Sequence, residues 1–321
     1  MSTPRRALVT GAGGFIGANL VRRLVADGHQ VTGVVRPGGD HWRTADIVDV
    51  ADIVEVDLCD EQSVDHLVGR TRPDWTFHLA AHGAYSWQAD AGRIVATNVV
   101  ATVVLADACA AAGCDAFVHA GSSSEYGFKD HAPREDEALE PNSRYAVAKA
   151  SATLFCRYVA EREAFPAVTL RLYSVFGPFE DPRRLVPALV VHGLRKELPP
   201  LVSPDTARDL VWVGDVVDAF VLAAATARTN AGAVYNVGTG EQTTVADLVE
   251  VARRALDIEA PPVWGTMPAR VWDTTTWVAD TTAIEAQLGW RPSTSLVEGF
   301  RRTVEWLSGN PRLWNVYDVR G

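Results

Sequence analysis

The chain has 321 residues, 47% of them hydrophobic and 22% charged, which is enough apolar material for a sizeable core and excludes general disorder. Forty acidic residues against 30 basic ones give a net charge of −10, which argues against nucleic acid or a membrane surface as a partner. Four cysteines without C-x-x-C spacing or a nearby histidine cluster argue against a metal site and a disulfide scaffold. With no long apolar run near the N-terminus, we expect a cytoplasmic protein without a signal peptide or membrane-spanning helix.

A glycine-rich stretch lies between a short apolar run, Ala7–Val9, and a segment with apolar residues at helical spacing, Asn19–Val25. Strand, glycine turn and helix in this order are typical of a nucleotide phosphate site. The first motif glycine would permit a tight turn, the second would let a pyrophosphate approach the backbone, and the third would let helix and strand pack closely. The residues of this stretch that we expect at the cofactor are Gly11, Gly14, Phe15, Ile16 and Gly17.

The next predicted strand, Gln30–Arg36, bears on the identity of the dinucleotide. In a doubly wound sheet the end of this strand meets the adenosine ribose, and an acidic residue there would bind a free 2′-hydroxyl. Arg36 stands at this end instead, and a guanidinium suits a 2′-phosphate. The sequence therefore favours NADP(H) over NAD, with a solvated surface arginine as the alternative explanation.

Two further strands are predicted at Ile53–Leu58 and Trp75–Ala81. The first ends at Asp57 and Leu58, where an adenine would lie. The second ends in small and apolar residues that would let a cofactor approach closely, and His82, which follows it, is expected to be structural rather than catalytic. The cofactor-contacting residues expected at this second strand end are Leu79, Ala80 and Ala81.

Polar residues that could carry catalysis follow a fifth strand, Ala116–Ala120. That strand leads into a serine-rich stretch, and serines at the carboxyl end of a parallel strand lie where open α/β sheets hold ligands. The helix that begins after Ser143 carries Tyr145 and Lys149 four residues apart, so both side chains project from one helix face. An earlier alanine-rich helix, from Asn98 to Ala112, is expected to be buried or to face a second subunit.

The alternation of strands and helices up to Leu172 predicts an α/β fold with a Rossmann-type, doubly wound parallel sheet. Beyond Gly177 this alternation gives way to proline, arginine and tryptophan clusters. We therefore expect a dinucleotide-binding domain over residues 1–172, with later returns near 208–240, and a mainly substrate-binding lobe over residues 173–321. Val234–Val237 is predicted to be one such return to the sheet.

Together these residues resemble the extended short-chain dehydrogenase/reductase family, in its NAD(P)-dependent branch of nucleotide-sugar epimerases, dehydratases and reductases. The resemblance runs from about Arg6 to Leu307. It rests on the glycine motif, on Asn98 in a helix and on the serine strand that ends in Tyr126-Gly127. Further motifs that carry it are Tyr145-x-x-x-Lys149, His78–Ala81, Arg208–Asp215 and Asn236–Gly240.

The resemblance implies a catalytic triad of Ser122, Tyr145 and Lys149. Tyr145 would be the general acid and base, Lys149 would lower the pKa of that tyrosine and hold the nicotinamide ribose, and Ser122 would hydrogen-bond the reacting substrate oxygen. Ser123 is the alternative catalytic serine. Arg208 and Arg270 would grip the substrate diphosphate; the sequence does not separate Arg183 from Arg184 as a further candidate. The implied substrate contacts are Ser123, Ser174, Arg208 and Arg270.

Two departures from the family pattern guide the choice of reaction. Sugar-nucleotide 4,6-dehydratases need an acid one or two residues after the catalytic serine, where this chain has Ser123 and Ser124. Glu125 comes one residue too late, so a dehydratase is disfavoured unless a local shift brings Glu125 round. Arg36 replaces the acid expected with tightly held NAD, which favours an enzyme that takes up and releases NADPH.

The sequence therefore predicts an NADPH-dependent ketoreductase of a nucleoside-diphosphate 4-keto-6-deoxy-sugar, with hydride delivered to C4 and a proton supplied by Tyr145. The main alternative is an NAD-dependent nucleotide-sugar 4-epimerase, which would use the same triad. A 4,6-dehydratase and a non-catalytic NAD(P)-binding regulator are weaker alternatives. The family also implies a homodimer through the helices around residues 98–112 and 144–162.

Overall fold

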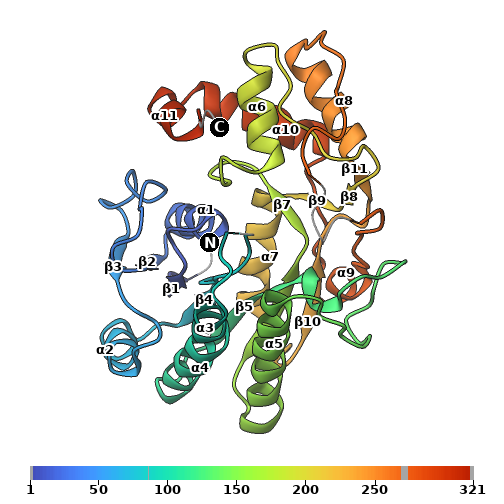
Figure 1. Ribbon diagram of the computed structural model, residues 1–321. Helices are drawn as coiled ribbons and strands as arrows, with labels where there is room; N and C mark the ends of the chain where they lie inside the picture. The colour runs from blue at the N-terminus through green and yellow to red at the C-terminus, as the bar shows by residue number, and fades with distance from the viewer. Residues whose placement is uncertain (1–2, 86, 269–273, 319–321) are drawn as a thin grey trace.

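A seven-stranded parallel sheet forms the centre of the computed structural model, which describes residues 3–85, 87–268 and 274–318. Its strand order is β10-β6-β5-β4-β1-β2-β3 (Figure 1). The order reverses at β1, which pairs with β2 on one side and β4 on the other, and open sheets bind ligands at such a switch point. The predicted doubly wound fold is confirmed. The strands are β1 (Arg6–Thr10), β2 (Gln30–Val35), β3 (Asp52–Glu55), β4 (Trp75–His78), β5 (Ala116–Ser122), β6 (Ala167–Leu172) and β10 (Val234–Val237).

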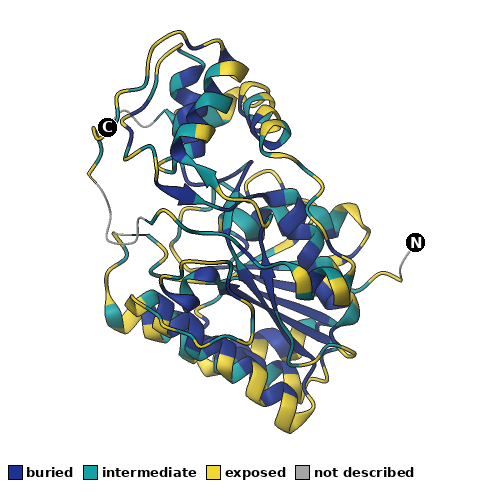
Figure 2. Ribbon diagram, turned by 90° about the vertical axis from the view of Figure 1, so that its right-hand side faces the viewer, coloured by how far each residue is buried: buried dark blue, intermediate teal, exposed yellow. Residues whose placement is uncertain are grey.

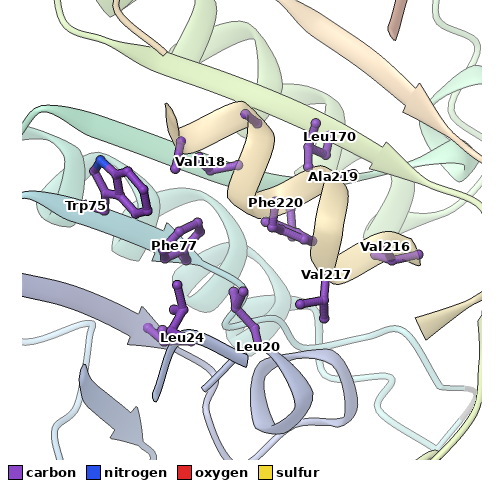
Figure 3. Packing of buried hydrophobic residues seen from close by; sticks show 14 of the residues in the cluster. Leu20, Leu24, Trp75, Phe77, Val118, Leu170, Val216, Val217, Ala219 and Phe220 are labelled. Carbon is purple, nitrogen blue, oxygen red and sulfur yellow. The ribbon is translucent and has the colours of Figure 1, made fainter. Parts of the chain in front are cut away.

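Helices cover both faces of the sheet, so the strands are buried on both sides while the outer faces of the helices are exposed (Figure 2). Leu20 and Leu24 of α1 and Phe220 of α7 pack on one face around Phe77 of β4 (Figure 3). The helices of this face are α1 (Phe15–Ala26), α7 (Val213–Thr226) and α9 (Thr282–Leu288). Those of the other face are α2 (Glu61–Thr71), α4 (Ala101–Ala111) and α5 (Arg144–Glu163).

One continuous helical segment, Ala91–Ala111, combines α3 (Ala91–Val95), a π-helical turn (Ala96–Val100) and α4. Among the described residues it is the one helix long and apolar enough to cross a membrane by length and composition. A core helix has the same composition, and the α4 part packs between α2 and α5 with Leu105 and Cys109 fully buried. The segment ends before Gly113, whose φ of 74° reverses the chain.

The later part of the chain builds a smaller lobe above the sheet in Figure 1. Two pairs of short strands accompany this lobe. β7 (Ser174–Phe176) runs parallel to β9 (Leu210–Trp212), and β8 (Ala207–Arg208) runs antiparallel to β11 (Thr243–Thr244). The predicted return at Val234–Val237 is present as β10, which pairs with β6. The functional division at residue 172 stays a prediction. The helices of this lobe are α6 (Leu185–Gly193), α8 (Val245–Leu256), α10 (Leu296–Ser308) and α11 (Trp314–Tyr317).

Two strands are shorter than the sequence predicts. β3 ends at Glu55, which pairs with Val35, the last residue of β2, so Asp57 and Leu58 lie in the turn before α2 rather than in the strand. β4 ends at His78, and Leu79, Ala80 and Ala81 begin the loop that follows. β3 ends opposite the last residue of β2, and β4 ends opposite the last residue of β1, although β5 on the other side of β4 continues to Ser122.

Candidate functional site

The turn between β1 and α1 is folded so tightly that Gly11 and Gly17 leave no room for a side chain. Gly11 has a φ of 69°, and the N–H of Gly14 donates to the carbonyl of Gly11 over 2.8 Å. A Cβ on Gly17 would lie 2.2 Å from that same carbonyl oxygen, and a Cβ on Gly11 would lie 2.7 Å from the backbone nitrogen of Ala80. The glycine turn therefore packs directly against the loop after β4, a contact that the sequence pattern does not indicate.

The N-terminus of α1 is open to an anion. Its cap residue, Gly14, is exposed and provides no side-chain hydrogen bond, and the first turn carries no acidic residue. The caps of α5, α8 and α10 are filled by Ser143, Thr244 and Ser295 instead. Because the first N–H groups of a helix have no partner within it, those of α1 can bind phosphate oxygens. The turn thus fits a dinucleotide pyrophosphate.

A positively charged side chain lies at the end of β2, where the adenosine ribose of a dinucleotide would lie. Arg36 is exposed there and forms no ion pair with any described residue. Gly13 of the glycine turn is close by, since a Cβ on it would lie 3.4 Å from Val35. His41, in the loop after β2, has its Nε2 3.3 Å from a Glu55 carboxylate oxygen. This corner is therefore polar and open, and Asp57 is exposed beside it.

Arg43 belongs to the dinucleotide side of the molecule, and the sequence pattern does not indicate it. Its Nη1 donates to the carbonyl of Gly13 over 3.4 Å, and its Nε donates to the carbonyl of Phe179 over 2.7 Å. The guanidinium stacks on Trp42, with 4.3 Å to the ring centroid, and its burial lowers its pKa. Arg43 therefore ties the glycine turn to the loop after β7, a long-range contact that local periodicity cannot show.

The structure brings the three predicted catalytic residues together at the carboxyl end of β5. Ser122 is the last residue of β5, and its Oγ accepts the N–H of Ser124 over 3.2 Å. Tyr145 and Lys149 lie on successive turns of α5, and Lys149 is buried. The Ser122 hydroxyl lies close enough to the Tyr145 phenol to act on its pKa. The backbone thus holds a hydroxyl, a phenol and an amine at the carboxyl edge of the sheet.

Burial sets the protonation behaviour of this group. It raises the pKa of Tyr145 to about 12, while the Ser122 hydroxyl opposes the rise. Burial lowers the pKa of Lys149 to about 8, and the charge of Glu125 opposes that fall. The lowering of the Tyr145 pKa by Lys149, which the family resemblance implies, stays a prediction for the protein with its dinucleotide bound.

Two buried histidines lie behind Lys149. The Nε2 of His119 is 3.4 Å from Nζ of Lys149, and its Nδ1 is 3.4 Å from the hydroxyl of Thr169. Burial lowers the pKa of His78 to about 3 and that of His119 well below its usual range. Both rings are therefore neutral at pH 7, and His119 can accept a hydrogen bond from the ammonium group of Lys149.

His82 is held by its backbone. Its N–H donates to the Asn98 Oδ1 over 2.8 Å, and its carbonyl accepts from the Asn98 Nδ2 over 2.7 Å. Asn98 is buried in the π-helical turn, a feature that often marks functional sites. Asn98 thus fixes the loop that follows β4 beside the triad.

The predicted substrate contacts lie mainly where the small lobe meets the sheet. Ser174 opens β7 and donates its N–H to the carbonyl of Asp209 over 3.0 Å, so it lies beside Arg208 of β8. The Arg208 guanidinium lies 5.9 Å from the ring centroid of Trp277. Ser123 is buried in the 3-10 turn after Ser122. Arg270 lies outside the described residues.

Arg183 and Arg184 differ in their surroundings. Arg183 pairs with Asp181 over 2.9 Å, and its guanidinium lies 3.6 Å from the ring centroid of Trp87. Arg184 is 3.6 Å from Glu180, whose buried carboxyl has its pKa raised to about 8 by desolvation. The structure therefore separates two residues that the sequence leaves equivalent, with Arg183 joined to the loop after β4.

Comparison with known proteins agrees with this geometry. The sequence model of the NAD dependent epimerase/dehydratase family matches residues 7–238. A UDP-glucose 4-epimerase of Mycolicibacterium smegmatis is 34% identical over 94% of this chain and 98% of its own length. A dTDP-glucose 4,6-dehydratase of Actinoplanes sp. is 29% identical over 96% of this chain and 99% of its own. A solved UDP-glucose 4-epimerase of Thermus thermophilus, in complex with NAD, has a TM-score of 0.83 and 27% identity, covering 94% of this chain and 99% of that one.

Proposed function

Since the chain belongs to the NAD dependent epimerase/dehydratase family, we propose that it is a nucleotide-sugar 4-epimerase with a UDP-hexose as substrate. The observation that carries the proposal is the Ser122, Tyr145 and Lys149 group beside a glycine turn, in a chain similar over nearly its whole length to a UDP-glucose 4-epimerase. The comparisons support this function better than the NADPH-dependent ketoreductase that the sequence alone predicts.

The three catalytic residues can carry out this reaction in the following order. A dinucleotide held on the glycine turn of Gly11, Gly14 and Gly17 would supply the hydride acceptor and donor that this reaction needs. The Tyr145 oxygen takes the proton of the sugar C4 hydroxyl while the Ser122 hydroxyl hydrogen-bonds the same oxygen, which leaves a 4-keto sugar. After the keto sugar turns its other face, Tyr145 gives the proton back, and C4 has the opposite configuration. Lys149 stabilises the phenolate form of Tyr145 by its charge.

The position of Glu125 argues against a 4,6-dehydratase. That reaction would need a carboxyl directed at the substrate after the catalytic serine, and the local shift that would supply Glu125 is not present. Glu125 is fully buried and accepts hydrogen bonds from the backbone of Ser122 and from Arg171. It is therefore directed into the protein rather than toward a substrate.

A specific observation favours the ketoreductase as a second candidate. Arg36 is exposed at the ribose end of β2 without an ion pair to any described residue, which suits a 2′-phosphate and hence NADPH. The test is to denature the purified protein and identify the released dinucleotide. Stoichiometric NAD supports the epimerase. A protein that is purified empty and binds NADPH at least tenfold more tightly than NADH would overturn it.

The substitution Arg36→Asp tests the ribose end of the site through the affinities for NADPH and NADH. We expect the substitution to weaken NADPH binding about tenfold or more, because a charge-assisted hydrogen bond to phosphate contributes about 1.5–3 kcal/mol. NADH binding should be unchanged or stronger, since an acid can accept from the free 2′-hydroxyl. Fluorescence titration measures both affinities, with Arg134→Asp in the exposed acidic loop as the matched control. Equal effects on both dinucleotides would show that Arg36 does not contact the ribose.

We further propose that the enzyme is a homodimer. Three exposed apolar residues of α5, Val147, Leu154 and Tyr158, form one stripe, and Val95 of the neighbouring α3 is also exposed. Leu154→Glu should convert the dimer to a monomer, because it places a charge at the centre of this stripe. Light scattering after size exclusion measures the mass, and Val297→Glu on α10, where the residue is 61% exposed, is the control. A wild-type protein that is already monomeric would refute the dimer.

A further inference from the structure

The carboxylate of Glu125 lies behind the catalytic serine and joins three elements. Its Oε1 accepts the backbone N–H of Ser122 over 2.8 Å and the hydroxyl of Thr153 over 3.0 Å. Its Oε2 accepts Nε of Arg171 over 2.9 Å. Ser122 ends β5, Thr153 belongs to α5 and Arg171 to β6, and all but Ser122 are buried. One side chain therefore fixes how these three elements sit relative to one another.

We propose that Glu125 is a positioning residue of the catalytic triad, which holds Ser122 at a fixed distance from α5 and supplies the negative charge that faces Lys149. The inference rests on the proposed function, because it assigns Glu125 a part in the chemistry of that site. Glu125 does not touch substrate in this account. It acts through Ser122 and Lys149.

The positioning follows from where the hydrogen bonds end. Thr153 lies one helical turn after Lys149 and two turns after Tyr145, so a bond to Thr153 fixes the helix that carries both residues. The bond to the N–H of Ser122 fixes the end of the strand that carries the serine. The strand backbone comes so close that a Cβ on Gly121 would lie 2.9 Å from Oε1 of Glu125. Ser122 and α5 are thus held by the same carboxylate.

The charge of Glu125 matters because the other groups around Lys149 are neutral. From β5 the ammonium group faces His119, and His78 of β4 lies behind; burial keeps both rings unprotonated at pH 7. From its own helix it faces Cys156, whose thiol has its pKa raised to about 12 by burial. Among the described residues, Glu125 is the carboxylate that acts on Lys149, and it favours the charged ammonium form.

Arg171 holds the carboxylate in place from the other side. Its Nη1 donates to the hydroxyl of Tyr126 over 2.7 Å, and that hydroxyl donates to the Asn236 Oδ1 of β10 over 2.8 Å. Arg171 also stacks on Tyr126, with 4.6 Å from its Cζ to the ring centroid. The ion pair is therefore anchored on β6 and β10, which is what a positioning residue needs.

The experiment compares Glu125→Gln with Thr153→Val. Glutamine keeps an acceptor for Ser122 and Thr153 but removes the charge, whereas valine removes one hydrogen bond and keeps the charge. The chain has three lysines, Lys129, Lys149 and Lys196, so lysine labelled with ¹³C at Cε gives three signals, and Lys149→Met assigns the relevant one. The titration of that signal measures the Lys149 pKa directly, without substrate.

We expect the Lys149 pKa to be about 8 in the wild type and about one pH unit lower in Glu125→Gln, because an opposite charge no longer favours the ammonium form. Arg171, left without its carboxylate, acts in the same direction. The alkaline limb of the kcat profile should move to lower pH with it. Thr153→Val should leave the pKa and the dinucleotide affinity unchanged but lower kcat about tenfold, since the triad is less well aligned.

The outcomes separate this inference from the proposed function. An unchanged Lys149 pKa in Glu125→Gln, or a wild-type kcat in Thr153→Val, would overturn the role of Glu125. If Glu125→Gln does not fold, the contrast between kcat and dinucleotide affinity in Thr153→Val decides the matter. If the wild type does not epimerise any nucleotide sugar, the proposed function fails, and the lysine titration still decides whether Glu125 supplies the charge at Lys149.

Discussion

Tyr145→Phe is expected to lower kcat about a thousandfold while it leaves dinucleotide binding within about twofold of the wild type. The substitution keeps the ring on the first turns of α5 and removes only the hydroxyl that moves the proton, and such transfers contribute about 10²- to 10⁴-fold to rate. Steady-state turnover of the nucleotide sugar gives kcat, and fluorescence titration gives the dinucleotide affinity.

Tyr158→Phe is the matched control, because Tyr158 lies on the same helix but is 54% exposed. It should retain wild-type turnover. Turnover by Tyr145→Phe close to the wild-type value would show that another group moves the proton, and the assignment of the triad would then be wrong.

Gly17→Ala is expected to have the second large effect, on both stability and dinucleotide binding. The new Cβ would lie 2.2 Å from the carbonyl oxygen of Gly11 and 2.8 Å from its carbonyl carbon. Because both neighbours are backbone atoms, the helix must move away from the turn, at a cost of about 3 kcal/mol in the free energy of unfolding. The N–H groups at the start of α1 move with it, so dinucleotide affinity should fall at least about tenfold.

Gly69→Ala is the control for this substitution. Gly69 lies within α2, and a Cβ there would meet nothing within 4 Å. It should raise the free energy of unfolding by about 0.5–1 kcal/mol, because alanine favours the helix. Denaturant unfolding measures both variants. A Gly17→Ala protein as stable as Gly69→Ala would contradict the close packing of α1 on the glycine turn.

The parts of the fold that the sequence predicts are those with a local signal. The glycine turn and α5 are predicted from periodicity and from residues that favour caps and turns, such as Ser143. The ends of β3 and β4 are mispredicted because each lies opposite the end of a neighbouring strand, β2 for β3 and β1 for β4, and these neighbours are more than fifteen residues away in sequence. Backbone pairing decides these ends, and no local residue signals it.

The candidate site, too, is predicted from the sequence only in part. Ser122, Tyr145 and Lys149 are found because their spacing is a known motif, whereas the burial of Glu125 depends on Arg171, 46 residues later in the chain. Arg43 is missed because its partners, Gly13 and Phe179, lie far from it in sequence. The choice of a reductase over an epimerase depends on one residue, Arg36, and a single exposed side chain is weaker support than similarity to an epimerase over 94% of the chain.

The central proposal is that the protein inverts C4 of a nucleotide sugar with a hydride that returns to the same molecule. The most direct measurement incubates the purified protein with UDP-glucose deuterated at C4, without added dinucleotide, and follows the products by NMR and mass spectrometry. We predict UDP-galactose that keeps the deuterium at C4, formed by the wild type and lost in Tyr145→Phe. No C4 epimer, together with NADPH-dependent reduction of a 4-keto-6-deoxy sugar nucleotide, would contradict the epimerase and restore the ketoreductase.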